Sequence, residues 1–276
     1  MMIGASGVVV LEPGIPGDHT LYDGEVTVKF DPTIHEYQVK DIAVSPDWRV
    51  VPSVTTVLSL IDKSKALVPW AARCCQNKFL ELVQPGTAYT QEQLETFSYQ
   101  IKDASKEQLE HAGRIGHETH EWIQNYLMAH SGNGLFPASP VDEHVRSCCR
   151  GAREWIKQAG IRPFAIERIL YSRKHQVVGT TDLAAALIVG GRTAICDWKS
   201  SNRLHDSYKL QLAAYRSIYA EMTNVFLDDR WLIRLDKNDS TFDPVCLPQE
   251  EADRDSESFF ALAHAFTLLQ SADLIS

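Results

Sequence analysis

The spacing of apolar residues changes near residue 160 and divides the chain into a mainly helical part and a part rich in strands. Residues 21–40 alternate between apolar and polar positions, which predicts a β-hairpin. Ser53 follows a proline and precedes an apolar run with helical spacing, so we expect it to cap the N-terminus of a helix. Helical spacing recurs in three further segments, over 63–83, in the second half of 90–130, and from about 142 to 160.

The segments after Gly160 predict strands that alternate with helices. Three apolar or alternating runs are expected to be strands, at residues 164–172, 177–189 and 192–200. A helix, a hairpin and a closing helix follow, at residues 205–222, 230–248 and 250–270. Helices before, within and after the strands indicate an α/β (α+β) fold in which helices flank one central mixed β-sheet.

Two of these strands place charged residues side by side. Gly190 and Gly191 predict a two-residue hairpin turn, which would place Asp182 opposite Lys199 and Ala184 opposite Asp197. Because directly opposed residues share a face of the sheet, Asp182, Asp197 and Lys199 are expected to project together. A slip of one residue in the turn would remove this juxtaposition.

Two carboxylates and an ammonium on a buried strand surface need partners, and two explanations are open. One is a network of salt bridges at the edge of the sheet. The other is a site for a hard cation, because two Asp oxygens suit Mg²⁺ or Mn²⁺, which also bind phosphate oxygens. A neighbouring lysine would then activate water or stabilise charge that develops on the phosphate.

A histidine lies on the apolar face of the helix predicted before residue 130. Gly116, His120, Ile123 and Leu127 are spaced i, i+4, i+7 and i+11, so His120 is expected to point toward the core. A core histidine and a metal-ligating histidine both fit this pattern. His117 lies one turn earlier, and the spacing H-E-x-H differs from the H-E-x-x-H of zinc proteases.

Composition and charge limit the classes of protein that remain. The 276 residues carry a formal net charge of −9, which argues against extended, non-specific binding of nucleic acid. A local basic groove remains compatible with this charge. The six cysteines have no CxxC spacing, and the N-terminus lacks the basic region of a signal peptide, so we expect reduced thiols and a cytoplasmic protein without a membrane span.

Basic residues gather in one helical segment around Trp70. We consider this cluster and two later residues as contacts for DNA phosphates: Lys63, Lys65, Arg73, Lys78, Arg173 and Lys174. The alternative is a solvated helical face without a nucleic-acid partner.

Four short motifs occur in an order that resembles a known nuclease family. They are Gly116 to His120 on a helix, Gly179 to Asp182 and Asp197 to Lys199 on successive strands, and Gln211 to Tyr215 on the next helix. The chain resembles the RecB-like exonuclease branch of the PD-(D/E)xK nuclease superfamily, in its phage and prophage forms. Each motif is weak alone, but four in order are specific. The resemblance implies a restriction-endonuclease-like core.

The resemblance also implies a role for each matching residue. His120, Asp182, Asp197 and the backbone carbonyl of Trp198 would hold Mg²⁺ or Mn²⁺, and Lys199 would be the catalytic lysine. Gln211 and Tyr215 would orient water or DNA, and Glu167 matches an acidic position often seen in this branch. The cysteines do not match the pattern of the relatives that bind an iron–sulfur cluster, so we expect no Fe–S cluster.

The sequence therefore predicts a single nuclease domain over residues 1–276. Its parts would be an N-terminal hairpin with helices (1–105), a catalytic core (106–225), and a C-terminal hairpin and helix (226–276). The expected activity is a metal-dependent DNA exonuclease that leaves 5′-phosphates, with DNA and, by family analogy, a recombination annealing protein as partners. A structure-selective endonuclease and an inactive DNA-binding or scaffold module are the alternatives.

Overall fold

The computed structural model describes residues 18–187 and 191–275, and these residues form two compact units. One unit comprises residues up to Leu60 together with Thr119 onward, and the other comprises Ile61–Glu118. The boundary between Glu118 and Thr119 falls inside one long helix, α3 (Gln91–His130). Within the described residues, no helix combines the length and the apolarity that crossing a membrane requires.

The predicted N-terminal hairpin is part of a larger sheet. Strands β2 (Val26–Asp31) and β3 (Glu36–Asp41) pair as expected, and β1 (Asp18–Leu21) and β4 (Ser45–Val51) extend them to a four-stranded antiparallel sheet. A single 3₁₀ turn, Tyr22–Gly24, follows β1. The inner face of this sheet packs on apolar residues of the second sheet to form one of the cores.

The second sheet is the mixed sheet that the sequence predicts. Its strands are ordered β5-β6-β7-β8-β9, and only the β7–β8 pair is parallel. The strands are β5 (Ile161–Ser172), β6 (Val177–Leu187), β7 (Arg192–Lys199), β8 (Asp229–Leu235) and β9 (Phe242–Cys246). The expectation of one central sheet is therefore incomplete, because the described residues form two sheets.

Most helices begin and end close to the predicted residues, but α3 begins earlier than its apolar spacing predicts. Ser53 caps α1 (Val54–Leu58) by accepting a hydrogen bond from the Thr56 N–H, and Asp142 and Gly160 cap α4 (Glu143–Ala159). The remaining helices are α2 (Ser64–Leu82), α3 (Gln91–His130), α5 (Ser207–Thr223), a 3₁₀ turn at Gln249–Glu251, and α6 (Ala252–Ser271). Helix α3 runs without a break through the whole polar and apolar segment 91–130.

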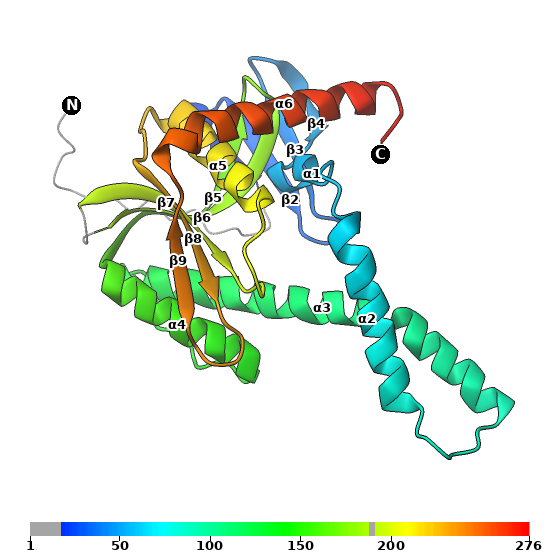
Figure 1. Cartoon of the computed structure of the whole chain (residues 1–276). Helices are drawn as coiled ribbons and strands as arrows, with labels where there is room; N and C mark the ends of the chain where they lie inside the picture. The colour runs from blue at the N-terminus through cyan, green and yellow to red at the C-terminus, as the bar shows by residue number, and fades with distance from the viewer. Residues whose placement is uncertain (1–17, 188–190, 276) are drawn as a thin grey trace. The chain divides into compact units, whose positions relative to one another are not determined.

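Helices cover both faces of the five-stranded sheet (Figure 1). Helix α4 and the C-terminal end of α3 pack on one face, in a core that includes Leu183, Cys196 and Trp198. Helix α5 lies on the other face, and α6 packs on α5. Because strand side chains alternate, Asp182 next to Leu183 and Asp197 next to Cys196 point toward the side of the sheet that α5 covers.

The register between β6 and β7 differs from the prediction by two residues. Leu183 pairs with Cys196, Ala184 pairs with Ile195 and Leu187 pairs with Arg192, so the predicted partners were wrong. The predicted turn cannot be compared directly, since its Gly190 lies outside the described residues. Because the shift is even, each side chain keeps its face, and the shared face of Asp182, Asp197 and Lys199 is retained.

Candidate metal and phosphate site

Three acidic residues form a row across three neighbouring strands. The pairs Ile166↔Leu183 and Arg168↔Thr181 place Glu167 of β5 opposite Asp182 of β6. Asp182 and Asp197 stand one position beyond the last paired residues of β6 and β7, Leu183 and Cys196. Adjacent strands lie about 5 Å apart, so the carboxylates of neighbouring strands in this row lie close together.

The Asp182 carboxylate lies between β6 and β7 and holds a peptide group of β7. Its Oδ2 atom accepts a hydrogen bond of 2.9 Å from the Trp198 N–H, beyond the point where the β6–β7 pairing ends. The same Oδ2 atom lies 3.4 Å from His120 Nδ1. Asp182 therefore connects the end of the β6–β7 ladder to helix α3.

His120 points its two ring nitrogens at different partners. Nε2 lies 3.1 Å from the Trp198 carbonyl oxygen, whereas Nδ1 faces Asp182 and lies 3.9 Å from Glu167 Oε1. Nε2 is the donor to the carbonyl in this arrangement, which leaves Nδ1 for the carboxylates. The Trp198 carbonyl thus orients His120 here, and its own role as a metal ligand stays a prediction.

The structure separates the two candidate histidines. His120 forms a group with Glu167 and Asp182 in which ligand atoms of all three residues lie within 4.8 Å of one another. His117 is exposed on the same helix and is not a member of this group. Of the two, His120 is the one that the fold brings to the acidic row.

Glu167 adopts a backbone conformation that is unusual for a strand residue. Its φ is +47°, in the left-handed region, although its neighbours Ile166 and Arg168 pair in the same register with β6. Such a conformation costs a non-glycine residue about 1–3 kcal/mol and persists only where the surrounding structure fixes it. The strained backbone coincides with the position that carries the third carboxylate.

Asp197 and Lys199 form an ion pair beside this group. Lys199 Nζ lies 2.7 Å from Asp197 Oδ2, with side-chain exposures of 16% and 2%. In this arrangement Asp197 faces the lysine, and it is not among the three residues that group with His120. The site therefore has two parts, a His–Glu–Asp cluster and an Asp–Lys pair, joined through the Trp198 peptide.

The electrostatics of the site indicate an excess of buried negative charge. Burial raises the pKa of Asp197 to about 6, against the opposing effect of Lys199, and burial also raises the pKa of Asp182. Burial by itself would lower the pKa of His120, but Asp182 and Glu167 outweigh it and raise that pKa to about 9. Without another cation, an imidazolium is the group that neutralises this pocket.

The donor set fits a divalent cation. Carboxylate oxygens are ligands for Mg²⁺ and Mn²⁺, and an imidazole nitrogen is a ligand that transition metals such as Mn²⁺ accept more readily than Mg²⁺ does. The neighbouring carboxylates raise the pKa of His120, so the pocket favours positive charge. Glu167 and Asp182 have side-chain exposures of only 20% and 10%, so a cation between them would be partly shielded from water. The same residue types also suit other transition metals, so the donors do not select one ion.

Gln211 and Tyr215 lie one turn apart on α5 and are both buried. Gln211 Nε2 donates a hydrogen bond of 3.2 Å to the Tyr215 hydroxyl. Burial raises the pKa of Tyr215 well above its usual value, with smaller contributions from Asp197 and Asp182. The ring lies against Gly179, where an added Cβ would come within 2.7 Å of Tyr215 Cε1. The glycine of the Gly179–Asp182 motif is thus the residue that admits this tyrosine.

Two aromatic residues near the site were not predicted. The Tyr208 ring lies 4.6 Å from Lys199 Nζ, and the Tyr37 hydroxyl lies 3.0 Å from Thr180 Oγ1. Tyr208, Gln211 and Tyr215 are spaced i, i+3 and i+7, so the helical face of the motif could have indicated Tyr208. No local sequence signal links Tyr37 to this site, because Tyr37 lies on β3 of the four-stranded sheet.

The basic residues proposed for DNA lie outside this group. Lys63, Lys65 and Arg73 are exposed at or on α2, in the unit of residues 61–118, and Lys78 pairs with Glu81 at 3.1 Å. Arg173 makes a bidentate pair with the buried Asp41 and a further contact with Glu25. Its guanidinium is therefore held by carboxylates of the first sheet.

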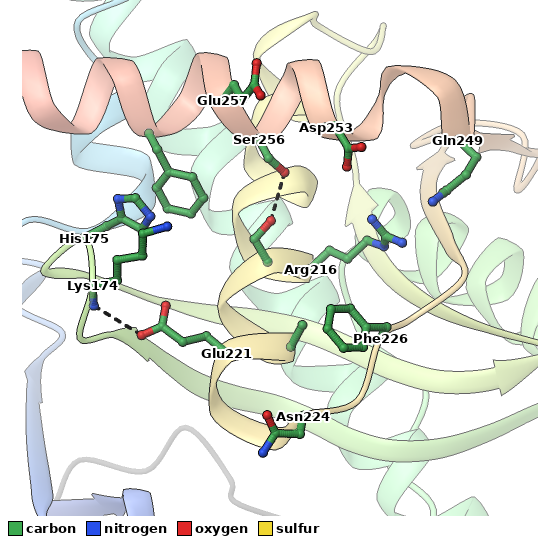
Figure 2. Close-up of a pocket in the computed structure, with 13 residues that line it drawn as sticks. Lys174, His175, Arg216, Glu221, Asn224, Phe226, Gln249, Asp253, Ser256 and Glu257 are labelled. Atoms are coloured by element: carbon green, nitrogen blue, oxygen red, sulfur yellow. Dashed lines mark hydrogen bonds between the residues drawn. The ribbon is translucent and has the colours of Figure 1, made fainter.

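Lys174 lies at a groove of about 870 Å³ between α5 and α6, which Figure 2 shows. Its backbone N–H donates to Glu221. The walls carry charges of both signs, with Lys174 and Arg216 against Glu221, Asp253 and Glu257. This mixture does not match the basic surface that a DNA backbone requires.

Comparisons with known proteins do not identify a family for this chain. No model of a known protein family matches the sequence, and no curated protein matches it.

Proposed function

We propose that this protein is a divalent-metal-dependent DNA exonuclease that hydrolyses phosphodiester bonds and leaves 5′-phosphates. The observation that carries the proposal is the convergence of His120, Glu167 and Asp182 beside the ion pair of Asp197 and Lys199. A cation site next to a partly buried lysine is suited to phosphoryl transfer, in which charge develops on phosphate oxygens. The order of the four motifs supports the assignment to DNA, and with it the restriction-endonuclease-like core.

His120, Glu167, Asp182 and Asp197 are the residues that would hold Mg²⁺ or Mn²⁺. When bound, the cation supplies Lewis acidity toward phosphate oxygens and favours ionisation of water. The Trp198 carbonyl fixes the ring of His120, as partners of a ligating histidine usually do. The Trp198 N–H does the same for the Asp182 carboxylate.

Lys199 places a positive charge where the phosphate charge would increase. Burial lowers the pKa of Lys199, but Asp197 and Asp182 outweigh this effect and raise it, so the amine is an ammonium at neutral pH. It would stabilise negative charge on the phosphate while the bond to the 3′-oxygen breaks. The Gln211 amide, fixed by the Tyr215 hydroxyl, is a group that can orient a water or a phosphate oxygen.

A digest of linear and circular DNA tests this function. With Mg²⁺ or Mn²⁺, the wild-type protein is expected to degrade linear DNA, spare a covalently closed circle, and release mononucleotides with 5′-phosphates. EDTA and the Asp182→Asn variant should each abolish the reaction. The His117→Ala variant, altered on the same helix outside the cluster, should remain active and serves as the matched control.

Each other outcome contradicts the proposal in a distinct way. Cutting of the circle would indicate an endonuclease with the same chemistry. Binding of DNA without cleavage under any metal would indicate a binding or scaffold module. Cleavage that survives both EDTA and Asp182→Asn would mean that the acidic cluster is not the catalytic site.

A further inference from the structure

The ammonium group of Lys199 contacts Asp197, which belongs to the Asp197–Lys199 motif, and Tyr208, which belongs to none of the four motifs. Asp197 Oδ2 lies 2.7 Å from Nζ, and the ring centroid of Tyr208 lies 4.6 Å from the same atom. Tyr208 is on the first turn of α5, on the same helical face as Gln211 and Tyr215. The amine is therefore held between a carboxylate of β7 and an aromatic ring of α5.

We propose that Tyr208 is a positioning residue that holds the Lys199 ammonium at the site through the face of its ring. A cation within about 6 Å of a tyrosine ring is attracted by the negative face of the π-system, and this attraction grows where water is excluded. The Lys199 side chain is 16% exposed, so the contact is made in a largely dry environment. The expected effect on the cleavage rate rests on the proposed function, whereas the contact between Tyr208 and Lys199 does not.

The geometry gives a reason why the carboxylate alone is an insufficient anchor. A lysine side chain has four rotatable bonds, and one contact at its end leaves much of this freedom. Asp197 is also expected to share its oxygens with a metal ion, which would weaken its hold on Nζ. The Tyr208 ring is independent of the metal, so it keeps the ammonium in place whether or not a cation binds.

The ring itself is fixed from its outer side. His205 packs edge-on against Tyr208, with ring centroids 5.5 Å apart and an interplanar angle of 80°. The Tyr208 N–H donates to the His205 carbonyl, which closes the turn that begins α5. The turn between β7 and α5 thus sets the position of the ring, and through it the position of the lysine.

Three variants separate a ring effect from a hydroxyl effect. Tyr208→Phe keeps the ring and loses the hydroxyl, while Tyr208→Leu and Tyr208→Gln lose the ring. We expect the single-turnover cleavage rate to fall about 10-fold in both ring-free variants and to stay within about twofold of wild type in Tyr208→Phe, as the strength of cation–π contacts implies. Mn²⁺ affinity by calorimetry should be unchanged in all three.

A second measurement does not depend on activity. Acylation of lysines by an amine-selective reagent, read by mass spectrometry on the metal-free protein, should modify Lys199 several-fold faster in Tyr208→Leu and Tyr208→Gln than in wild type or Tyr208→Phe. Lys106, with a side chain 75% exposed, provides the internal reference. Thermal melts identify any variant that is unfolded. If either Tyr208→Leu or Tyr208→Gln is unfolded, the other one is used for the comparison.

The inference is overturned if the ring-free variants match wild type in Lys199 acylation, or if Tyr208→Phe loses as much rate as Tyr208→Leu. The second result would assign the effect to the hydroxyl. If wild type shows no metal-dependent cleavage, the proposed function fails, whereas the acylation result still decides the role of Tyr208.

Discussion

Replacing Gly179 by alanine tests how β6 and α5 fit together at the site. An ideal Cβ at this position would lie 2.7 Å from Tyr215 Cε1 and 3.3 Å from Val54 Cγ2. Carbon atoms pack best at about 3.5–4.0 Å, so the ring would have to retreat by about 1 Å. Tyr215 is 4% exposed and its hydroxyl is bonded to Gln211, so the ring has no free direction in which to move.

Overpacking of this kind lowers the free energy of unfolding by about 1–3 kcal/mol. Gly113→Ala is the matched control, since it makes the same chemical change inside helix α3, where a Cβ meets nothing within 4 Å. That variant should gain up to about 1 kcal/mol from helix propensity. Because both changes remove the same backbone freedom from the unfolded chain, their difference of about 1–4 kcal/mol reports the clash.

Urea denaturation followed by tryptophan fluorescence measures both variants. In a Tyr215→Leu background, Gly179→Ala should cost at least about 1 kcal/mol less than in wild type, since the opposing ring is gone. Equal stabilisation by the two alanines, or strict additivity of Gly179→Ala with Tyr215→Leu, would refute the close approach of this tyrosine to β6. We also expect Gly179→Ala to reduce cleavage, because the displaced ring carries Gln211 with it.

Three further predictions concern substitutions of His120, Lys199 and Arg173. His120→Ala should weaken Mn²⁺ binding by about tenfold or more in calorimetry, whereas His117→Ala should change it less than twofold, and the reverse order would mean that the wrong histidine was chosen. Lys199→Ala should lower the single-turnover rate by roughly 10²-fold with metal affinity retained, and Lys199→Arg should not restore it; an active arginine variant would make the lysine structural. Arg173→Ala should lower the free energy of unfolding by about 3 kcal/mol because it leaves the fully buried Asp41 without its cationic partner, while DNA affinity stays unchanged. A stable variant with weaker DNA binding would return Arg173 to the DNA contacts.

The candidate site shows where sequence reasoning succeeds and where it stops. Strand alternation places Asp197 and Lys199 on one face, and the predicted hairpin adds Asp182 to it. The observed pairing keeps this face because it differs from the predicted pairing by an even number of residues, but the predicted partners within the face were wrong. The true register aligns Asp182 with Asp197, which the sequence did not reveal.

Local sequence determined the elements of this protein, because the signals for caps and periodicity lie in adjacent residues. Ser53 accepts its hydrogen bond from Thr56, only three residues away, and the ends of α4 at Asp142 and Gly160 are equally local. The alternation that puts Asp197 and Lys199 on one face is local as well.

Only the tertiary structure decided which distant groups meet. His120 meets Asp182, and the Tyr208 ring meets Lys199, only because the fold packs different elements together. The left-handed backbone of Glu167 likewise depends on how its strand is packed. The same holds for the four-stranded sheet β1–β4, whose inner face packs on residues of β5 and β6. Such contacts depend on the balance of burial and pairing over the whole fold, and a short stretch of sequence does not contain that information.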